Sequence, residues 1–305
     1  MDIFVQQIIN GLVLGSIYAL VALGYTMVYG IMGLINFAHG EVVMIGAMVA
    51  LFTLKALSGL PVFVSVPLAL AAAAAVCMAV GFSIEKIAYR PLRRAPKLAP
   101  LITAIGISII LQHLAMLIWG RNYHAFPAVL PVSEHEIFGA TITGLQIVII
   151  IIAAAMMAGL TLLVQRTRLG RAMRATSENP PIAQLMGVNI NQIISATFVI
   201  GSALAAVAGL MVSANYSIAH YYMGFMLGLK AFTAAVLCGI GNLAGAMLGG
   251  ILLGVIESLG AGYIGDLTGG FLGSHYQDIF AFFVLIGVLI FRPSGLIGER
   301  VAERA

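Results

Sequence analysis

The stretch LQIVIIIIAAAMMAGLTLLV, Leu145–Val164, contains no charged residue. A helix needs roughly 20 apolar residues to cross the hydrocarbon core of a bilayer, so this stretch predicts one membrane-spanning helix. Other apolar stretches lie on both sides of it, at Ile8–Tyr29, Phe37–Leu54, Val62–Ile84, Leu98–Ile118, Ile193–Ser213, Gly224–Ile240, Ala244–Gly262 and Ile279–Phe291. We therefore expect an all-α fold, a polytopic transmembrane helical bundle of eight or nine spans with broken or short helices.

The composition of the whole chain agrees with this expectation. Only 9% of the 305 residues are charged, 61% are hydrophobic, and the mean hydropathy is +1.08. A soluble domain has about 25% charged residues, so the composition excludes an ordinary soluble enzyme, a nucleic-acid binder and a disordered chain. The two cysteines lie in apolar or glycine-rich segments and give neither a disulfide framework nor metal-ligand spacing. We expect no metal site, and we treat residues 1–305 as a single transmembrane domain.

The basic residues form three clusters that predict the orientation of the chain. The clusters contain Lys86, Arg90, Arg93, Arg94 and Lys97, then Arg166, Arg168, Arg171 and Arg174, then Arg292, Arg300 and Arg304. The positive-inside rule places all three in the cytoplasm. The loop 119–143 and the stretch 261–277 are poor in basic residues and belong outside. Counting spans back from these loops predicts that the N-terminus is outside and that Gly239–Gly245 is a turn between two spans.

The cytoplasmic segment 165–191 predicts a helical hairpin. A first helix is expected at Leu169–Ser177, and Asn179 is expected to cap a second helix whose first residue is Pro180. Gly187 suits the position that follows a helix. This segment is either a solvated connector or a docking element for a cytoplasmic partner. Docking is considered because hydrophobic residues on a short cytoplasmic loop mark a contact. For docking, we expect these residues to contribute: Arg171, Arg174, Glu178, Asn179, Ala183, Leu185 and Gly187.

A polar segment, Asn36-Phe37-Ala38-His39-Gly40-Glu41, interrupts an apolar run. Ionisable groups at membrane depth are costly and are candidates for function. Three roles are open: a solute path, a proton relay, or a structural cap with Glu41 near the positive end of the next helix. Of the two functional roles the solute path is favoured, since few other buried acids or histidines are present. The candidate path residues are Asn36, His39 and Glu41.

Other polar residues of the spans have structural interpretations. Lys230 is expected to extend towards the outer interface, and Glu257 to be hydrated near the outer end of its span. Gln112 and His113 are expected to form interhelical hydrogen bonds. The chain has no G-x-x-x-x-G-K-[ST] pattern, since none of its four lysines precedes Ser or Thr. No catalytic motif is present either, so we expect a protein that is not an enzyme and has no cofactor of its own.

Six segments together form a recognisable set of motifs: LGSIYALVALGYTMVYG at Leu14–Gly30, IMGLINFAHGEVVMIG at Ile31–Gly46, SIEKIAYRPLR at Ser83–Arg93, GRAMRATSENPPIAQLMGVN at Gly170–Asn189, KAFTAAVLCGIGNLAGAMLGG at Lys230–Gly250 and RPSGLIG at Arg292–Gly298. In this order they resemble the branched-chain amino acid permeases of binding-protein-dependent ABC importers, and most closely the LivH-type subunit. The resemblance covers essentially the whole chain.

The resemblance implies a heteromeric importer in a bacterial inner membrane. Two cytoplasmic ATPase subunits would hydrolyse ATP and dock on the hairpin, and a LivM-like permease chain would complete the pore. A periplasmic binding protein would deliver a branched-chain amino acid, and the chain would contact membrane lipid but no nucleic acid. The alternatives are a related permease for urea or short amides and a secondary amino acid transporter that acts alone. A structural membrane protein is disfavoured by the polar segment at 36–41.

Overall fold

The computed structural model describes residues 2–93, 95–96, 98–129, 133–137, 139–268, 277–292 and 295–297. Most of them are helical. The helices are α1 Asp2–Met32, α2 His39–Ala56, α3 Val62–Ser83, the π-helix η1 Ile84–Tyr89, α4 Arg90–Leu92, α5 Leu98–Trp119, α6 Gly144–Arg166, α7 Arg168–Glu178, α8 Pro180–Leu185, α9 Ile190–Tyr216, α10 Met223–Cys238, α11 Leu243–Leu267 and α12 Gln277–Phe291. The expected all-α bundle is confirmed.

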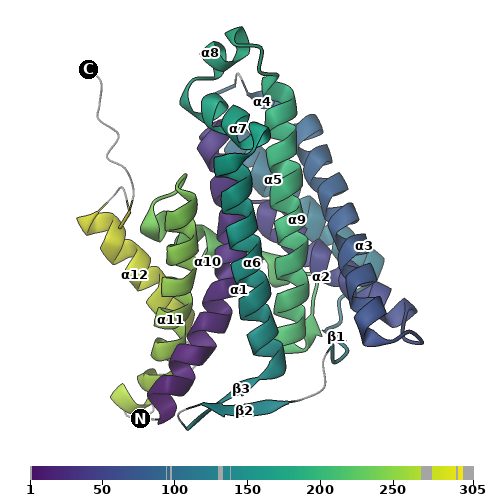
Figure 1. The fold of residues 1–305 in the computed structure, drawn as a ribbon, viewed down its shortest axis with the longest axis vertical. Coiled ribbons are helices and arrows are strands. Elements are labelled where there is room, and N and C mark those ends of the chain that lie inside the picture. The colour runs from purple at the N-terminus through teal and green to yellow at the C-terminus, as the bar shows by residue number, and fades with distance from the viewer. Residues whose placement is uncertain are drawn as a thin grey trace.

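Four short strands connect helix ends. Strand β1 (His124–Ala125) pairs antiparallel with β4 (Ile218–Ala219), and β2 (Glu134–Ile137) forms a hairpin with β3 (Ala140–Thr143). Thr143 then caps α6, because its side chain accepts from the Gln146 N–H and the Gln146 side chain accepts from the Thr143 N–H. These strands close loops at the end of the bundle where α1 begins (Figure 1).

Each predicted span corresponds to one helix. Among the described residues, seven helices are long and apolar enough to cross a membrane, and two shorter apolar helices lie at Met223–Cys238 and Phe282–Phe291. Helix α10 has 16 residues, so it is roughly 24 Å long and shorter than the roughly 30 Å hydrocarbon core. The predicted turn between α10 and α11 is present: Gly239 and Gly241 have positive φ, and Asn242 caps α11.

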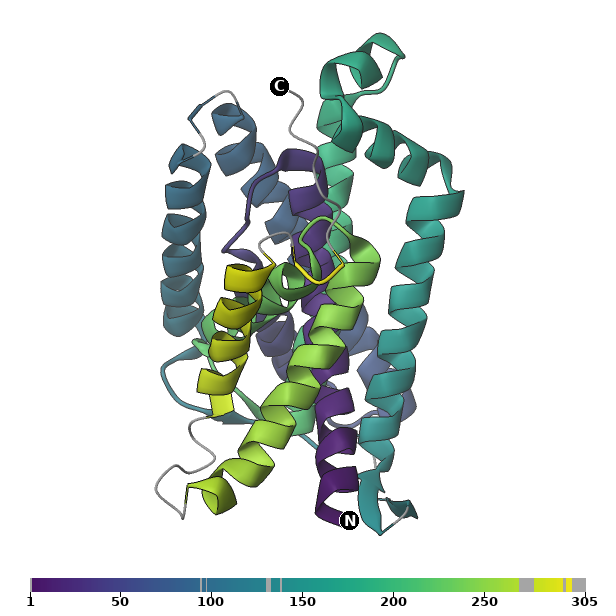
Figure 2. The ribbon, with the colours of Figure 1, turned by 90° about the vertical axis from the view of Figure 1, so that its left-hand side faces the viewer.

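The two ends of the bundle differ in the elements that they present. Helices α7 and α8 extend from one end, whereas α1 begins at the opposite end beside β2 and β3 (Figures 1 and 2). This agrees with the parity of the predicted topology, in which the N-terminus and the 165–191 segment face opposite sides. The placement of each end relative to a membrane stays a prediction. Arg94, Lys97, Arg300 and Arg304 of the predicted clusters lie outside the described residues.

Helix α1 lies in the centre of the bundle, where small residues allow its neighbours to approach closely. A Cβ atom built on Gly11 would come within 2.6 Å of the Val255 Cα atom, and one on Gly15 within 2.6 Å of the Ile251 Cα atom. Helix α11 therefore packs backbone against backbone on α1 (Figure 2). Small residues four apart are typical of helix contacts within membranes, where close packing replaces the hydrophobic driving force.

Candidate functional site

Asn36 lies in the turn between α1 and α2 and is 3% exposed. Its Oδ1 atom accepts a 3.2 Å hydrogen bond from the Ala38 N–H and a 3.0 Å hydrogen bond from the Tyr89 hydroxyl. The first bond closes the turn before α2, as asparagine side chains commonly do. The second connects that turn to the π-helix η1. Asn36 thus connects the turn between α1 and α2 to the end of η1.

His39 opens α2 and is 2% exposed. Its ring packs edge-on against Tyr25, with the ring centroids 5.0 Å apart. Gly24 of α1 makes room for the imidazole, since a Cβ atom there would overlap the ring. The His39 Nε2 atom has no hydrogen-bond partner among the described residues. The residue is therefore packed between central helices with one nitrogen left open.

Glu41, in the first turn of α2, is buried with 1% exposure and turns its side chain towards α5. Its Oε1 atom accepts hydrogen bonds from Gln112 Nε2 at 2.6 Å and from Ser108 Oγ at 3.1 Å. Its Oε2 atom has no hydrogen-bond partner within the part of the chain that the structure describes. The interhelical bond predicted for Gln112 is confirmed. The prediction for His113 is wrong, because its Nδ1 atom pairs with the Ile109 carbonyl of the same helix.

The three predicted path residues do not meet at one point. Asn36 faces η1, His39 packs between α1 and α9, and Glu41 faces α5. A cavity of about 360 Å³ lies between α1, α5 and α10, and its lining includes Ser108 and Gln112, the two residues that bind Glu41. Glu41 thus contacts two residues of the cavity lining but is not part of that lining itself. The sequence pattern marked the carboxylate, whereas its two α5 partners become apparent only from the packing.

The 165–191 segment forms the predicted helical hairpin. The first helix begins and ends one residue beyond the predicted bounds, at Arg168 and Glu178. The Asn179 side chain accepts a 3.1 Å hydrogen bond from the Ile182 N–H, with Pro180 at the first position of α8. Gly187 has a φ of +87° directly after α8. The predicted cap residues of the second helix are therefore confirmed.

The candidate docking residues divide into an exposed set and an internal set. Leu185 is 86% exposed and Met186 is 80% exposed at the tip, and Arg171, Glu178, Asn179 and Gly187 are also exposed. Ala183 is 3% exposed, so it lies inside the hairpin, which contradicts its predicted place on the contact surface. Arg174 is exposed as well, and its guanidinium group donates to the Val164 carbonyl at the end of α6. Ala183 and Arg174 hold the hairpin together and fix it on α6.

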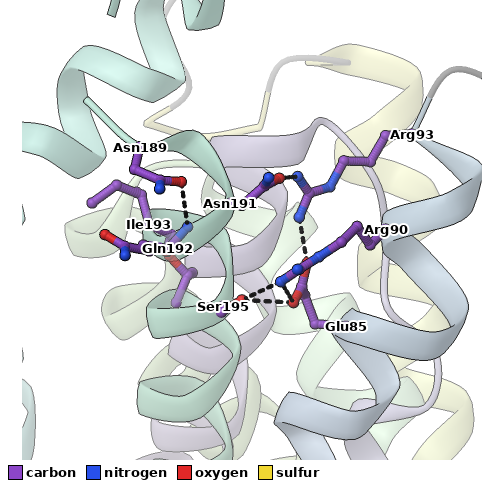
Figure 3. A network of polar contacts seen from close by, with 9 residues as sticks. Glu85, Arg90, Arg93, Asn189, Asn191, Gln192, Ile193 and Ser195 are labelled. Atoms are coloured by element: carbon purple, nitrogen blue, oxygen red, sulfur yellow. Dashed lines mark hydrogen bonds and ion pairs between the residues drawn. The ribbon is translucent and has the colours of Figure 1, made fainter. Parts of the chain in front are cut away.

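A network at the same end of the bundle surrounds Glu85 of η1, which is buried with 0% exposure (Figure 3). Arg90 lies 2.9 Å from Glu85 Oε2, and Arg93 forms a second ion pair with Glu85. From α9, Ser195 donates to Glu85 at 2.7 Å, and Asn191 accepts from Arg93 at 2.5 Å. The predicted first basic cluster therefore does more than mark orientation: it connects η1 and α4 to α9.

Lys230, Glu257 and the half-buried Asp278 form a second cluster of charges. Lys230 Nζ lies 2.6 Å from a Glu257 oxygen and 2.7 Å from an Asp278 oxygen. Lys230 is 8% exposed and Glu257 is 0% exposed, so the expected extension of Lys230 to the interface and the expected hydration of Glu257 are both wrong. The Tyr18 hydroxyl also contacts Glu257, at 3.3 Å. Desolvated charges are stable only when they are paired, and the pairing here connects α1, α10, α11 and α12.

The remaining site predictions concern metals and cysteines. Within the described ranges, no group of three or more His, Cys, Asp or Glu side chains could hold a metal ion. Cys77 and Cys238 are free and buried.

Known proteins resemble the chain over nearly its whole length. Residues 7–289 match the family model described as the branched-chain amino acid transport system permease component. The chain is 50% identical to the high-affinity branched-chain amino acid transport system permease protein BraD of Pseudomonas aeruginosa, over 99% of this chain and 98% of that one. It is 45% identical to the corresponding protein LivH of Salmonella typhimurium, over 99% of this chain and 97% of that one.

A more distant relative extends the similarity beyond bacteria. The chain is 29% identical to a probable branched-chain amino acid transport permease protein LivH of Methanocaldococcus jannaschii, over 97% of this chain and 94% of that one. These relatives are transport permeases and not enzymes. With its spans, its hairpin and a family match that covers most of the sequence, the chain belongs to the family of permease components of branched-chain amino acid transport systems.

Proposed function

We propose that this protein is the permease subunit of a binding-protein-dependent ABC importer that carries branched-chain amino acids across a bacterial inner membrane. The family membership and the names of the 50% and 45% identical relatives support this assignment. The chain is a multi-pass membrane permease with seven helices of spanning length among the residues described. It supplies the path for the solute and no catalytic group.

The exposed hairpin tip is the observation that best supports coupling to a motor. Leu185 and Met186 present large apolar side chains to the aqueous side, at 86% and 80% exposure. Such exposed apolar residues mark a contact with another protein. The sequence contains no P-loop pattern, so the energy must come from elsewhere. Two cytoplasmic ATPase subunits that bind the hairpin and hydrolyse ATP fulfil this requirement, and this chain needs no cofactor.

The hairpin connects two long helices, and this suggests how docking moves the pore. Helix α6 ends at Arg166 and α9 begins at Ile190, so a displacement of the hairpin acts on both. The Glu85 network connects α9 to η1 (Figure 3), and the Tyr89 hydroxyl connects η1 to Asn36 beside His39 and Glu41. ATP-driven closure of the ATPase dimer thereby changes the conformation of the turn between α1 and α2 and switches access to the solute path.

The other partners belong to the opposite end and the sides of the bundle. A LivM-like permease chain completes the pore, and a periplasmic binding protein delivers the amino acid to the end where β2 and β3 lie. Membrane lipid covers the outward faces of helices such as α5, where Ile102 and Leu117 are 68% and 77% exposed. No contact with nucleic acid is proposed.

Uptake by the reconstituted importer tests the proposal. The complex of this chain with its partner permease and ATPases is placed in liposomes with the binding protein, and leucine uptake is measured with ATP after an uncoupler has collapsed the proton gradient. We expect uptake to require ATP and to persist with the uncoupler. Uptake that needs the gradient instead would identify a secondary transporter, and uptake of urea or acetamide without leucine would identify a different permease.

A further inference from the structure

We infer that the cavity between α1, α5 and α10 is a subsite that holds the amino acid as a zwitterion, with its ammonium group at Ser108, Gln112 and Glu41. This inference rests on the proposed function and assigns it particular residues. The cavity has a volume of about 360 Å³. Its lining combines two polar side chains of α5 with apolar side chains of α5 and α10, and this combination suits an aliphatic amino acid.

The wall formed by α5 attracts a cation. Ser108 and Gln112 lie one helical turn apart and both donate to the Oε1 atom of Glu41. A serine hydroxyl that donates its hydrogen retains acceptor lone pairs, and a glutamine retains its carbonyl oxygen. The wall therefore presents oxygen acceptors to the cavity, with a carboxylate directly behind them.

Glu41 itself lacks a counter-charge. It is 1% exposed, and its second oxygen, Oε2, has no hydrogen-bond partner among the described residues. An ionised carboxylate in an apolar interior is costly unless a cation lies nearby. Its partners Ser108 and Gln112 are neutral, so an ammonium group in the cavity would supply the missing positive charge.

Most of the remaining lining is apolar. Phe225 and Leu229 of α10 face the cavity together with Ile105 and Ile109 of α5. Aliphatic and aromatic walls with a few placed polar groups are typical of small-molecule sites. They suit a branched aliphatic side chain, and the lining also contains Tyr25 and Tyr222.

The carboxylate of the amino acid needs a different partner, because the cavity lining contains neither arginine nor lysine. Helix α10 begins beside the cavity at Met223, and its N-cap residue Tyr222 makes no side-chain capping bond. The N-terminus of a helix carries a partial positive charge. Short helices in transporters point this end at anionic substrate groups. In this bundle, however, the turn faces Glu41, because a Cβ atom on Gly224 would come within 2.8 Å of the Glu41 Oε2 atom. The subsite is therefore assigned through the ammonium group of the amino acid.

Direct binding to the permease–ATPase complex, without the binding protein, tests the subsite. We expect saturable binding of radiolabelled leucine by the detergent-solubilised complex. 4-Methylpentanoate lacks the ammonium group and should compete poorly, whereas 3-methylbutylamine retains that group and should compete. Gln112→Leu should weaken leucine binding roughly 10- to 100-fold, the range for a lost hydrogen bond to a charged group. The matched control is His113→Leu, whose side chain bonds only within α5 and should bind as the parent does.

Gln112→Leu also removes a hydrogen bond to Glu41 and could therefore misfold. A second pair of variants tests the cavity without that change. Leu229→Trp enlarges a side chain of the cavity lining without removing a hydrogen bond and should weaken binding, whereas Leu117→Trp, at a position of α5 that is 77% exposed, should not. Parent-like leucine binding by both Gln112→Leu and Leu229→Trp would overturn the subsite, as would the absence of saturable binding by the parent up to millimolar leucine. ATP-driven leucine uptake by the parent would in either case leave the proposed function standing. Its absence would refute that function separately.

Discussion

Three buried glutamates place carboxyl groups inside a bundle whose interior is otherwise mostly apolar. Glu41, Glu85 and Glu257 are all 1% exposed or less. Each has partners on other helices: Glu41 on α5, Glu85 on α9 and Glu257 on α1 and α10. Removal of one member of a buried pair leaves an unpaired charge, and that is strongly destabilising. These residues therefore set the relative positions of helices.

The Glu85 network gives the first prediction. Glu85→Gln leaves Arg90 and Arg93 without a carboxylate, and we expect the melting temperature of the purified complex to fall by at least about 3 °C. Thermal unfolding followed by tryptophan fluorescence or dye binding measures the shift. Glu136→Gln, an exposed position on β2, is the control. Equal melting temperatures for the two variants would show that the network does not stabilise the bundle.

The Lys230 cluster gives the second prediction. Lys230→Met leaves Glu257 and Asp278 facing each other without a cation, so we expect low yield and low thermal stability. Lys230→Met combined with Glu257→Gln removes one of these negative charges and should recover part of the loss, because contacting residues are not additive. A double-mutant cycle on thermal stability checks this. If the losses of thermal stability of the two single variants simply add in the double variant, the pairing is contradicted.

At the scale of elements, the hairpin of α7 and α8 combines a rigid frame with an exposed tip. Its frame comes from local signals: the Thr167 and Asn179 caps, the proline at the start of α8 and the positive φ of Gly187. Its attachment comes from Arg174, which donates to the end of α6. A rigid element of this kind can transmit force from a partner to the helices on either side.

The third prediction concerns this tip. Leu185→Ser with Met186→Ser should weaken association with the ATPase subunits roughly 10- to 100-fold, since burial of one large apolar side chain contributes about 1.5–3 kcal/mol. Co-purification and ATPase stimulation measure the loss. Thermal stability should remain unchanged, because both side chains are exposed. Gln184→Ser, also exposed, is the matched control. Unaltered co-purification of the double variant would exclude the tip as the docking surface.

At the scale of the whole molecule, close contacts around α1 hold the bundle together and leave its outer faces apolar. Gly15 and Gly254 allow α1 and α11 to touch through their backbones. By contrast, α3, α5 and α6 are buried along one narrow face only. This division gives a packed centre and a lipid-compatible surface.

The fourth prediction follows from that centre. Gly254→Leu places a large side chain against the backbone of Gly15, and we expect it to prevent stable assembly of the bundle. Gly159→Leu on α6 should be tolerated, because a Cβ atom there meets no other atom within 4 Å. Monodispersity in size-exclusion chromatography compares the two. Equal behaviour would show that close approach of α1 and α11 is dispensable.

The fifth prediction concerns the orientation of the molecule. His135→Cys on β2 and Leu185→Cys on the hairpin should react with an impermeant maleimide from opposite sides of the membrane. The outside reagent should label the first and the inside reagent the second, in right-side-out and inside-out vesicles. The native cysteines are both buried and should give a low background. Labelling of both positions from one side would refute the predicted topology.

The sequence determined by itself those features that depend on neighbouring residues. The spans follow from uninterrupted apolar runs, and the hairpin follows from caps such as Asn179 that act three residues away. The α10–α11 turn follows from its clustered glycines. These features are local because a helix hydrogen-bonds within itself and needs only an apolar surface to lie in a membrane.

Only the tertiary structure decided how the polar residues are paired. Glu41 meets Gln112 across 71 residues of sequence, Glu85 meets Ser195 across 110, and Lys230 meets Glu257 across 27. From the sequence alone, Lys230 and Glu257 are predicted to contact water, and no sequence pattern marks Ser108 as a partner of Glu41. In an apolar interior a charge is stable only beside its partner, and the partner is selected by helix packing rather than by sequence proximity.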